Sequence, residues 1–211
     1  MQDQALMTGM LFSDTYKTIA SEAQGLFRDR GSRFIALAIP VTGQEEIRQR
    51  LEELRKEYHD ARHHCYAWVL SPDRQAWRAN DDGEPSGTAG RPILGQINSR
   101  ELTDILIVVI RYFGGTLLGV SGLINAYRSA AEDALANAQI IEKTVMRRYL
   151  VKFPYLSMND VMKVLKEEGC SQKAHSYGND CSVEISVRAS AAERITERLR
   201  KISGLTVSLA E

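Results

Sequence analysis

The sequence is poor in the features that mark secreted, disulfide-stabilised or metal-binding domains. Its three cysteines are an odd number, and no two of them form a CxxC pair. This pattern excludes a disulfide framework and fits a reducing compartment. The first residues lack a basic start followed by a long apolar run, so they do not predict a signal peptide. We therefore expect a cytoplasmic protein.

Long apolar runs and an excess of one charge are also absent. The longest apolar run, Ile105 to Ile110, is far too short to cross a bilayer, so we expect no membrane association. The 27 Lys and Arg residues balance the 27 Asp and Glu residues, which argues against indiscriminate, charge-driven binding of nucleic acid. Residues 141–211 nevertheless hold three more basic than acidic residues, which permits a basic face there.

What is present is an ordinary globular mixture, with 44% hydrophobic and 26% charged residues. Strand and helix patterns predict an α+β fold in two domains, residues 1–140 and 146–211. Thr42 and Ser190 are each followed three residues later by Glu, which predicts a capping box at two helix starts. In the first domain we expect strands at 16–26, 32–41, 65–70, 75–79 and 103–113, and helices at 43–58, 91–98 and 122–137.

The second domain has a compact pattern of its own. Strands are expected at 148–153, 171–177, 181–187 and 205–209, with helices beginning near 157 and 190. The resulting βαββαβ order is the ferredoxin-like pattern, which hosts many functions and specifies none. Its basic residues either line one face or are ordinary solvated positions, and no paired aromatic motif of the RNA-recognition-motif kind is present. They are Arg147, Arg148, Lys152, Lys163, Lys166 and Lys173.

The loop at 80–90 is the first candidate site. It is rich in glycine and carries three carboxylates and two hydroxyls, on Asp81, Asp82, Glu84, Ser86 and Thr88. Such a loop either binds a ligand through backbone N–H groups and hydroxyls or simply connects two elements. The spacing of its acids does not match the calcium-binding loop of an EF-hand, and we expect neither a metal nor a cofactor.

The second candidate is the glycine-rich segment at 111–122, where a buried strand leads into a helix. Backbone N–H groups and a helix N-terminus there could meet a phosphate. The spacing matches neither GxGxxG nor the P-loop, and the alternative is a tight strand-to-helix crossover. We expect the two glycine-rich segments, 81–90 and 114–119, to lie close together and form the main concave site.

Arg62-His63-His64 precedes a strand and leaves two interpretations open. One is a surface turn in which a histidine is hydrogen-bonded beneath the loop. The other is a general base or a zinc ligand, although no cysteine or third histidine has metal spacing to the pair. Ser86, His63 and Asp82 also supply the residue types of a catalytic triad, but no GxSxG elbow is present.

Four stretches together resemble the YigZ/IMPACT family. They are SRFIA at 32–36, ARHHCYAW at 61–68, NDDGEPSGTAGRP at 80–92, and RYFGG at 111–115 with Gly119 and Gly122-Leu123. The resemblance implies a ribosomal protein S5 domain 2-like fold for the N-terminal domain. It also implies a ferredoxin-like C-terminal domain similar to domain V of elongation factor G. It implies translational control through protein partners in the eukaryotic relatives and nucleic-acid or ribosome binding in bacterial members, with no catalytic residues.

The sequence departs from the family at one position. Members commonly have a Gly-Gly-x-Lys-Leu-Gly pattern, and Leu117 stands here where that lysine would be. One potential phosphate contact is therefore absent from this loop.

We expect a non-enzymatic, translation-associated regulator that binds RNA, the ribosome or a translation partner protein. The alternatives are an enzyme acting on a phosphorylated or peptide substrate at the two loops, and a protein–protein adaptor without nucleic acid. The expected binding residues are Arg33, Arg62, His63, Asp82, Glu84, Ser86, Thr88, Arg91, Arg111, Gly114, Gly115 and Gly119.

Overall fold

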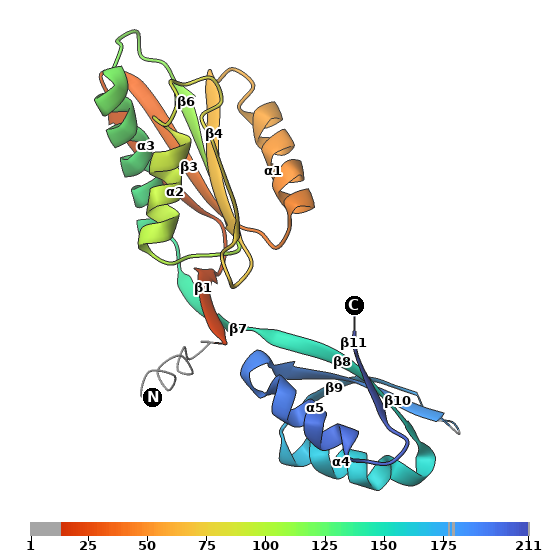
Figure 1. Ribbon diagram of the computed structural model, residues 1–211. Coiled ribbons are helices and arrows are strands. Elements are labelled where there is room, and N and C mark those ends of the chain that lie inside the picture. Colours follow the sequence, from red (N-terminus) through yellow and green to blue (C-terminus); the bar gives the residue numbers. More distant parts are fainter. Residues whose placement is uncertain (1–13, 177, 179, 211) are drawn as a thin grey trace, which may run out of the picture. The chain divides into compact units, whose positions relative to one another are not determined.

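The computed structural model describes residues 14–176, 178 and 180–210, which form a mixed α+β structure (Figure 1). The chain divides into two compact units. The larger unit is Tyr16–Lys143, and the smaller unit runs from Thr144 onward and includes Asp14 and Thr15. The chain therefore passes between the units twice. The predicted boundaries of independent domains, 1–140 and 146–211, stay a prediction.

A five-stranded antiparallel sheet is the centre of the larger unit, in the order β2-β3-β6-β4-β5. Its middle strand is the most apolar stretch of the sequence, and residues 105 to 110 of this strand are fully buried, which confirms the predicted central strand. The strands are β2 (Ala23–Asp29), β3 (Ser32–Pro40), β4 (His63–Leu70), β5 (Ala76–Asn80) and β6 (Ile105–Tyr112).

Helices cover both faces of this sheet (Figure 1). On one face lies α1 (Gln44–Glu57), and on the other lie α2 (Gly90–Ser99) and α3 (Gly119–Ala136). Alanines of α3 let the helix approach β2 closely. A Cβ atom on Gly25 of β2 would lie 2.2 Å from the backbone nitrogen of Ala134.

Three expectations for the larger unit are wrong in detail. The single strand expected at 16–26 is two strands, because β1 (Thr15–Ile19) pairs with β7 (Ile140–Thr144) and β2 pairs with β3. The capping box at Thr42 is shifted by one residue. Glu46, not Glu45, accepts the Thr42 backbone N–H at 2.7 Å, because Gly43 is the N-cap of α1. In addition, the long helix α3 begins at Gly119 and not at 122.

The smaller unit has a four-stranded antiparallel sheet in the order β11-β8-β10-β9. Its two α-helices pack on the same face of the sheet and bury one apolar core (Figure 1). The strand and helix order follows the expected βαββαβ pattern. The elements are β8 (Met146–Pro154), α4 (Met158–Glu167), β9 (Ser171–Ser176), β10 (Asp180–Arg188), α5 (Ala192–Arg200) and β11 (Thr206–Leu209).

The capping box expected at Ser190 is not formed. A short 3-10 turn, Ala189–Ala191, precedes α5, and Ala191 is the N-cap without a side-chain cap. The Ser190 hydroxyl instead donates to the Asp14 carboxylate at 2.5 Å. Residues 1–13, 177 and 179, which belong to the predicted first domain and hairpin, lie outside the described residues.

No helix among the described residues has both the length and the apolar character that crossing a bilayer requires.

Candidate functional site

Asp81 organises the loop between β5 and α2. Its carboxylate accepts three backbone N–H groups, from Gly87 at 2.8 Å, Ala89 at 3.0 Å and Gly90 at 2.8 Å. Burial alone would raise the pKa of Asp81, but these hydrogen bonds outweigh it and hold the pKa below its usual value. The carboxylate thus satisfies N–H groups at the start of α2, which have no partner within the helix.

Asp82 ties the same loop to β4 and α1. Its carboxylate accepts the backbone N–H of His64 at 2.6 Å and the guanidinium of Arg55 at 3.2 Å. The ring Nδ1 of His63 donates to the Asp82 carbonyl oxygen at 2.7 Å. A triad of Ser86, His63 and Asp82 is therefore not formed, because the Asp82 carboxylate does not orient the His63 ring. The structure agrees with the other interpretation, in which a histidine is hydrogen-bonded beneath the loop.

Glu84 lies in a buried polar network under the loop. Its Oε1 accepts the Arg111 guanidinium at 2.5 Å and the Tyr127 hydroxyl at 2.7 Å, and its side chain is 4% exposed. The Cys65 thiol lies 3.3 Å from the Tyr127 hydroxyl and donates to the Asp81 carbonyl oxygen. Burial raises the pKa of both Tyr127 and Cys65, so both groups stay protonated.

The remaining loop residues are structural or exposed. The buried Thr88 hydroxyl donates to the Pro85 carbonyl oxygen at 2.7 Å, and Ser86 is exposed. In the second glycine-rich segment, a Cβ atom on Gly114 would lie 1.9 Å from the carbonyl carbon of Gly31. Only glycine permits this crossing of two backbones.

Gly115 and Gly119 have positive φ angles, of 86° and 72°. They turn the chain from the end of β6 into the start of α3. The glycines therefore serve a tight strand-to-helix crossover, which was the alternative to a phosphate loop.

The two loops meet at a cavity of about 320 Å³, so the two segments lie close together as predicted. The expectation that they form the main concave site is not confirmed, because a larger cavity of about 390 Å³ lies elsewhere in the same unit. Glu84 and Pro85 line it from the first loop, and residues 117–120 line it from the second. Its rim carries exposed apolar side chains on Phe113, Leu117 and Val120, with exposed fractions of 41%, 81% and 59%. These three residues, with Arg62, are called the apolar rim below.

The predicted binding residues do not all reach this cavity. Arg62, His63, Glu84, Arg111 and Gly119 line it. Among them Arg62 is exposed, with its guanidinium carbon 5.8 Å from the Phe113 ring centroid, whereas Arg111 is buried.

Two predicted arginines lie elsewhere. Arg33 stacks on Tyr112, with its guanidinium carbon 4.4 Å from the ring centroid, and Arg91 is exposed at the start of α2. Neither Arg33, Arg91, Gly114 nor Gly115 is among the lining residues. The apolar character of the rim was missed, although its signal was present as Leu117 in place of the family lysine.

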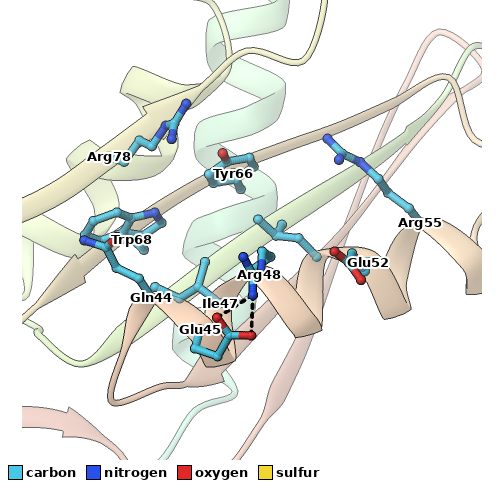
Figure 2. Close-up of a pocket in the computed structure, with 10 residues that line it drawn as sticks. Gln44, Glu45, Ile47, Arg48, Glu52, Arg55, Tyr66, Trp68 and Arg78 are labelled. Carbon is cyan, nitrogen blue, oxygen red and sulfur yellow. Dashed lines mark hydrogen bonds and ion pairs between the residues drawn. The ribbon is translucent and has the colours of Figure 1, made fainter.

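A second cavity, of about 390 Å³, lies on the opposite face of the sheet, between α1 and strands β4 and β5 (Figure 2). Tyr66 and Trp68 line it from β4, and Arg78 from β5 is the cross-strand neighbour of Trp68. On the helix side, the Arg48 guanidinium binds both oxygens of Glu45 at 2.6 Å.

Arg55 also lines the second cavity and pairs with Asp82 of the loop. The loop therefore lines the first cavity through Glu84 and is tied to the second through the ion pair between Asp82 and Arg55. No sequence pattern singled out this second cavity, because its residues come from three separate elements. Within residues 14–176, 178 and 180–210, no three His, Cys, Asp or Glu side chains are grouped closely enough to hold a metal ion.

Comparison with known proteins identifies relatives of this chain. The family described as the Impact N-terminal domain matches residues 30–135. The IMPACT family member YvyE of Bacillus subtilis is 32% identical over 172 residues, covering 82% of this chain and 79% of that protein. The IMPACT family member YigZ of Escherichia coli is 39% identical over 136 residues, covering 64% of this chain and 67% of that protein.

A solved structure shares the fold over nearly the whole chain. It is described as the crystal structure of a hypothetical protein, is 30% identical and has a TM-score of 0.70. The likeness covers 93% of this chain and 98% of that chain.

Proposed function

We propose a function from the premise that this chain belongs to the YigZ/IMPACT family. The proposal is that it is a non-enzymatic, cytoplasmic regulator of translation that binds RNA, the ribosome or a translation partner protein. It requires no cofactor and no membrane. The larger unit is proposed to be an S5 domain 2-like domain, and the smaller unit a ferredoxin-like domain similar to domain V of elongation factor G.

The carboxylates of the loop are already occupied, and this observation carries the proposal. Asp81 accepts three backbone N–H groups, Asp82 accepts His64 and Arg55, and Glu84 accepts Arg111 and Tyr127. A general acid or base must be free to exchange a proton with a substrate. The acidic side chains that left an enzyme as an alternative therefore fix the conformation of the loop.

The groups left facing outward suit binding. The apolar rim combines three exposed large side chains with one exposed guanidinium, around a cavity that the rigid loop shapes. Exposed apolar clusters edged by polar groups mark interaction sites. Within the larger unit, we assign Arg62 as the cation that contacts a partner. Arg111 is not assigned this role, because Glu84 neutralises its charge.

Co-sedimentation with ribosomes at two salt concentrations tests this proposal. We expect the wild-type chain to pellet with ribosomes at low salt and to be released at higher salt. Arg62→Ala should reduce pelleting, whereas Arg128→Ala, which removes an exposed arginine of α3 away from the cavity lining, should not. A wild-type chain that stays in the supernatant at every salt concentration overturns ribosome binding and leaves free RNA or a translation partner protein as the target.

A further inference from the structure

The sheet of the smaller unit has two faces of different character. On one face, α4 and α5 bury Tyr149, Val151 and Phe153 of β8. Strand geometry points alternate residues to the opposite face, so Arg148, Leu150 and Lys152 lie there. Among the described residues, no helix packs on that second face (Figure 1).

The second face is polar and basic, and we call it the basic sheet face. The strand register aligns Lys152 with Ser182 and Thr206, Leu150 with Glu184 and Ser208, and Glu184 with Lys173. Its cations are four, on Arg148, Lys152, Lys173 and Arg188, and its carboxylates are two, on Asp180 and Glu184. The Glu184 carboxylate lies 3.8 Å from the Arg148 guanidinium. The face comprises Met146, Arg148, Leu150, Lys152, Pro154, Ser171, Lys173, Ser176, Asp180, Ser182, Glu184, Ser186, Arg188, Thr206 and Ser208.

We propose that the basic sheet face binds the phosphate backbone of double-helical RNA. This inference rests on the proposed function and selects RNA as the partner of this surface. Arg148, Lys152, Lys173 and Arg188 are exposed and outnumber the two acids, which gives a field complementary to a polyanion. The hydroxyls of Ser171, Ser176, Ser182, Ser186 and Thr206 can donate to phosphate oxygens and to ribose 2′-OH groups.

The spacing of the cations fits several phosphates at once. Lys152 and Lys173 lie two strands apart, which is about 10 Å, and Arg148 and Lys152 are four residues apart along β8, which is about 13 Å. A nucleic-acid duplex of that length carries roughly seven phosphates. Each cation can therefore contact a different phosphate of one duplex.

Other occupants suit this face less well. Single-stranded nucleic acid is held largely by aromatic side chains that stack on its bases, and none of the face residues is aromatic. Protein interfaces concentrate their energy in buried aromatic and large apolar anchors, and the face has only Leu150 and the strand-end Met146 as large apolar side chains. A hydroxyl-lined basic surface favours a duplex recognised by its shape.

The test uses the full chain and a labelled RNA duplex of roughly 20 base pairs, somewhat longer than a compact duplex-binding domain spans. Affinity is measured by fluorescence anisotropy between roughly 50 and 200 mM salt. The triple variant Arg148→Gln, Lys152→Gln, Lys173→Gln should lower the slope of log affinity against log salt by about 2–3 units, because three phosphate contacts are lost.

A second triple variant provides the matched control. Lys163→Gln, Lys166→Gln and Lys201→Gln remove the same charge from exposed positions in or next to α4 and α5, and should leave the slope close to that of the wild type. Circular dichroism establishes that both variants are folded. An equal loss of slope in both triple variants overturns the inference, because net charge alone would then explain binding.

The remaining outcomes separate this inference from the proposed function. A chain that pellets with ribosomes through Arg62 but does not bind the duplex overturns the inference and leaves the proposed function standing. If the triple variant of the basic sheet face binds the duplex as the wild type does, the inference is likewise overturned and the proposed function stands. The triple variant of the basic sheet face could instead lose binding to a single-stranded probe, or to an isolated acidic ribosomal protein, and still bind the duplex. That result assigns the face to that partner and also overturns the inference.

Discussion

Arg111 and Glu84 form a buried ion pair beneath the loop, and removing one partner leaves the other charged and unpaired. Such a loss costs about 3–5 kcal/mol of folding stability. We therefore expect Arg111→Ala to lower the melting temperature of the larger unit markedly while any residual RNA binding keeps its salt slope. Circular dichroism and anisotropy on the same sample measure both quantities.

Arg91→Ala is the control for that prediction, because Arg91 is exposed at the start of α2. The melting temperature of Arg91→Ala should stay near the wild-type value. If Arg91 contacts a phosphate, the slope of log affinity against log salt should fall by somewhat under one unit. A stable Arg111→Ala protein with a reduced slope would contradict the structural role of Arg111 and restore it as a phosphate contact.

His64 makes the stability of the larger unit depend on pH. Burial lowers the pKa of His64, and the nearby Asp82 carboxylate opposes this effect only in part. The unfolded chain therefore binds a proton more readily than the folded chain does, once the pH falls below about 6.5. We expect the melting temperature to fall between about pH 7 and pH 5. His64→Gln should flatten this dependence, whereas His59→Gln, at an exposed position after α1, should retain it.

Residue identities predicted the candidate site only in part. The loop and the crossover were found because glycines and acids cluster there, and the two segments do line one cavity. The roles of the acids were not predictable, since Glu84 meets Arg111 and Tyr127 across 27 and 43 residues of sequence. A pattern read along the chain does not register partners that only the folded sheet brings together.

Helix α3 and strand β2 approach each other at Gly25, and this contact allows a test at the level of elements. A Cβ atom on Gly25 would collide with backbone atoms of Ala134 and Ala130, which cannot move independently of α3. We expect Gly25→Ala to destabilise the larger unit by about 1–3 kcal/mol through overpacking. Chemical denaturation measures the difference.

Gly95 supplies the opposite control. It lies within α2, and a Cβ atom there meets nothing within 4 Å. Gly95→Ala should stabilise the larger unit by about 0.4–1 kcal/mol, because alanine restricts the unfolded chain and favours the helix. If Gly25→Ala and Gly95→Ala changed the free energy of unfolding in the same direction, the steric account of the α3–β2 contact would be contradicted.

Periodicity predicted most elements because their apolar faces are local properties of the sequence. The helix at α1 and the central strand β6 are examples, since their apolar positions follow the helical and buried-strand patterns. The bend between β1 and β2 was missed because β1 pairs with β7, more than a hundred residues later. The shifted caps at Thr42 and Ser190 reflect local backbone turns that propensity does not resolve.

At the scale of the whole molecule, the smaller unit should fold without the larger one. Its core is formed by its own strands and helices, and Asp14 adds two hydrogen bonds, to the Val145 N–H and the Ser190 hydroxyl. We expect a polypeptide of residues 144–211 to melt cooperatively, somewhat below the same transition in the full chain, since each hydrogen bond contributes about 0.5–1.5 kcal/mol.

Calorimetry of the fragment and of full-length Asp14→Ala provides the comparison. The full-length variant should lower the transition of the smaller unit and leave the other transition in place. A fragment with no cooperative transition and no strand signal in circular dichroism would show that the smaller unit depends on the rest of the chain.

The pairing of β1 with β7 also determines where the larger unit begins and ends. The Ala20 N–H donates to the Gln139 carbonyl oxygen at 2.9 Å, so the two ends of this unit lie side by side. A unit with adjacent ends tolerates circular permutation. We therefore expect the stretch from Tyr16 to Lys143 to stay folded when its ends are joined by a few residues, or when it is inserted into an exposed turn of an unrelated host protein.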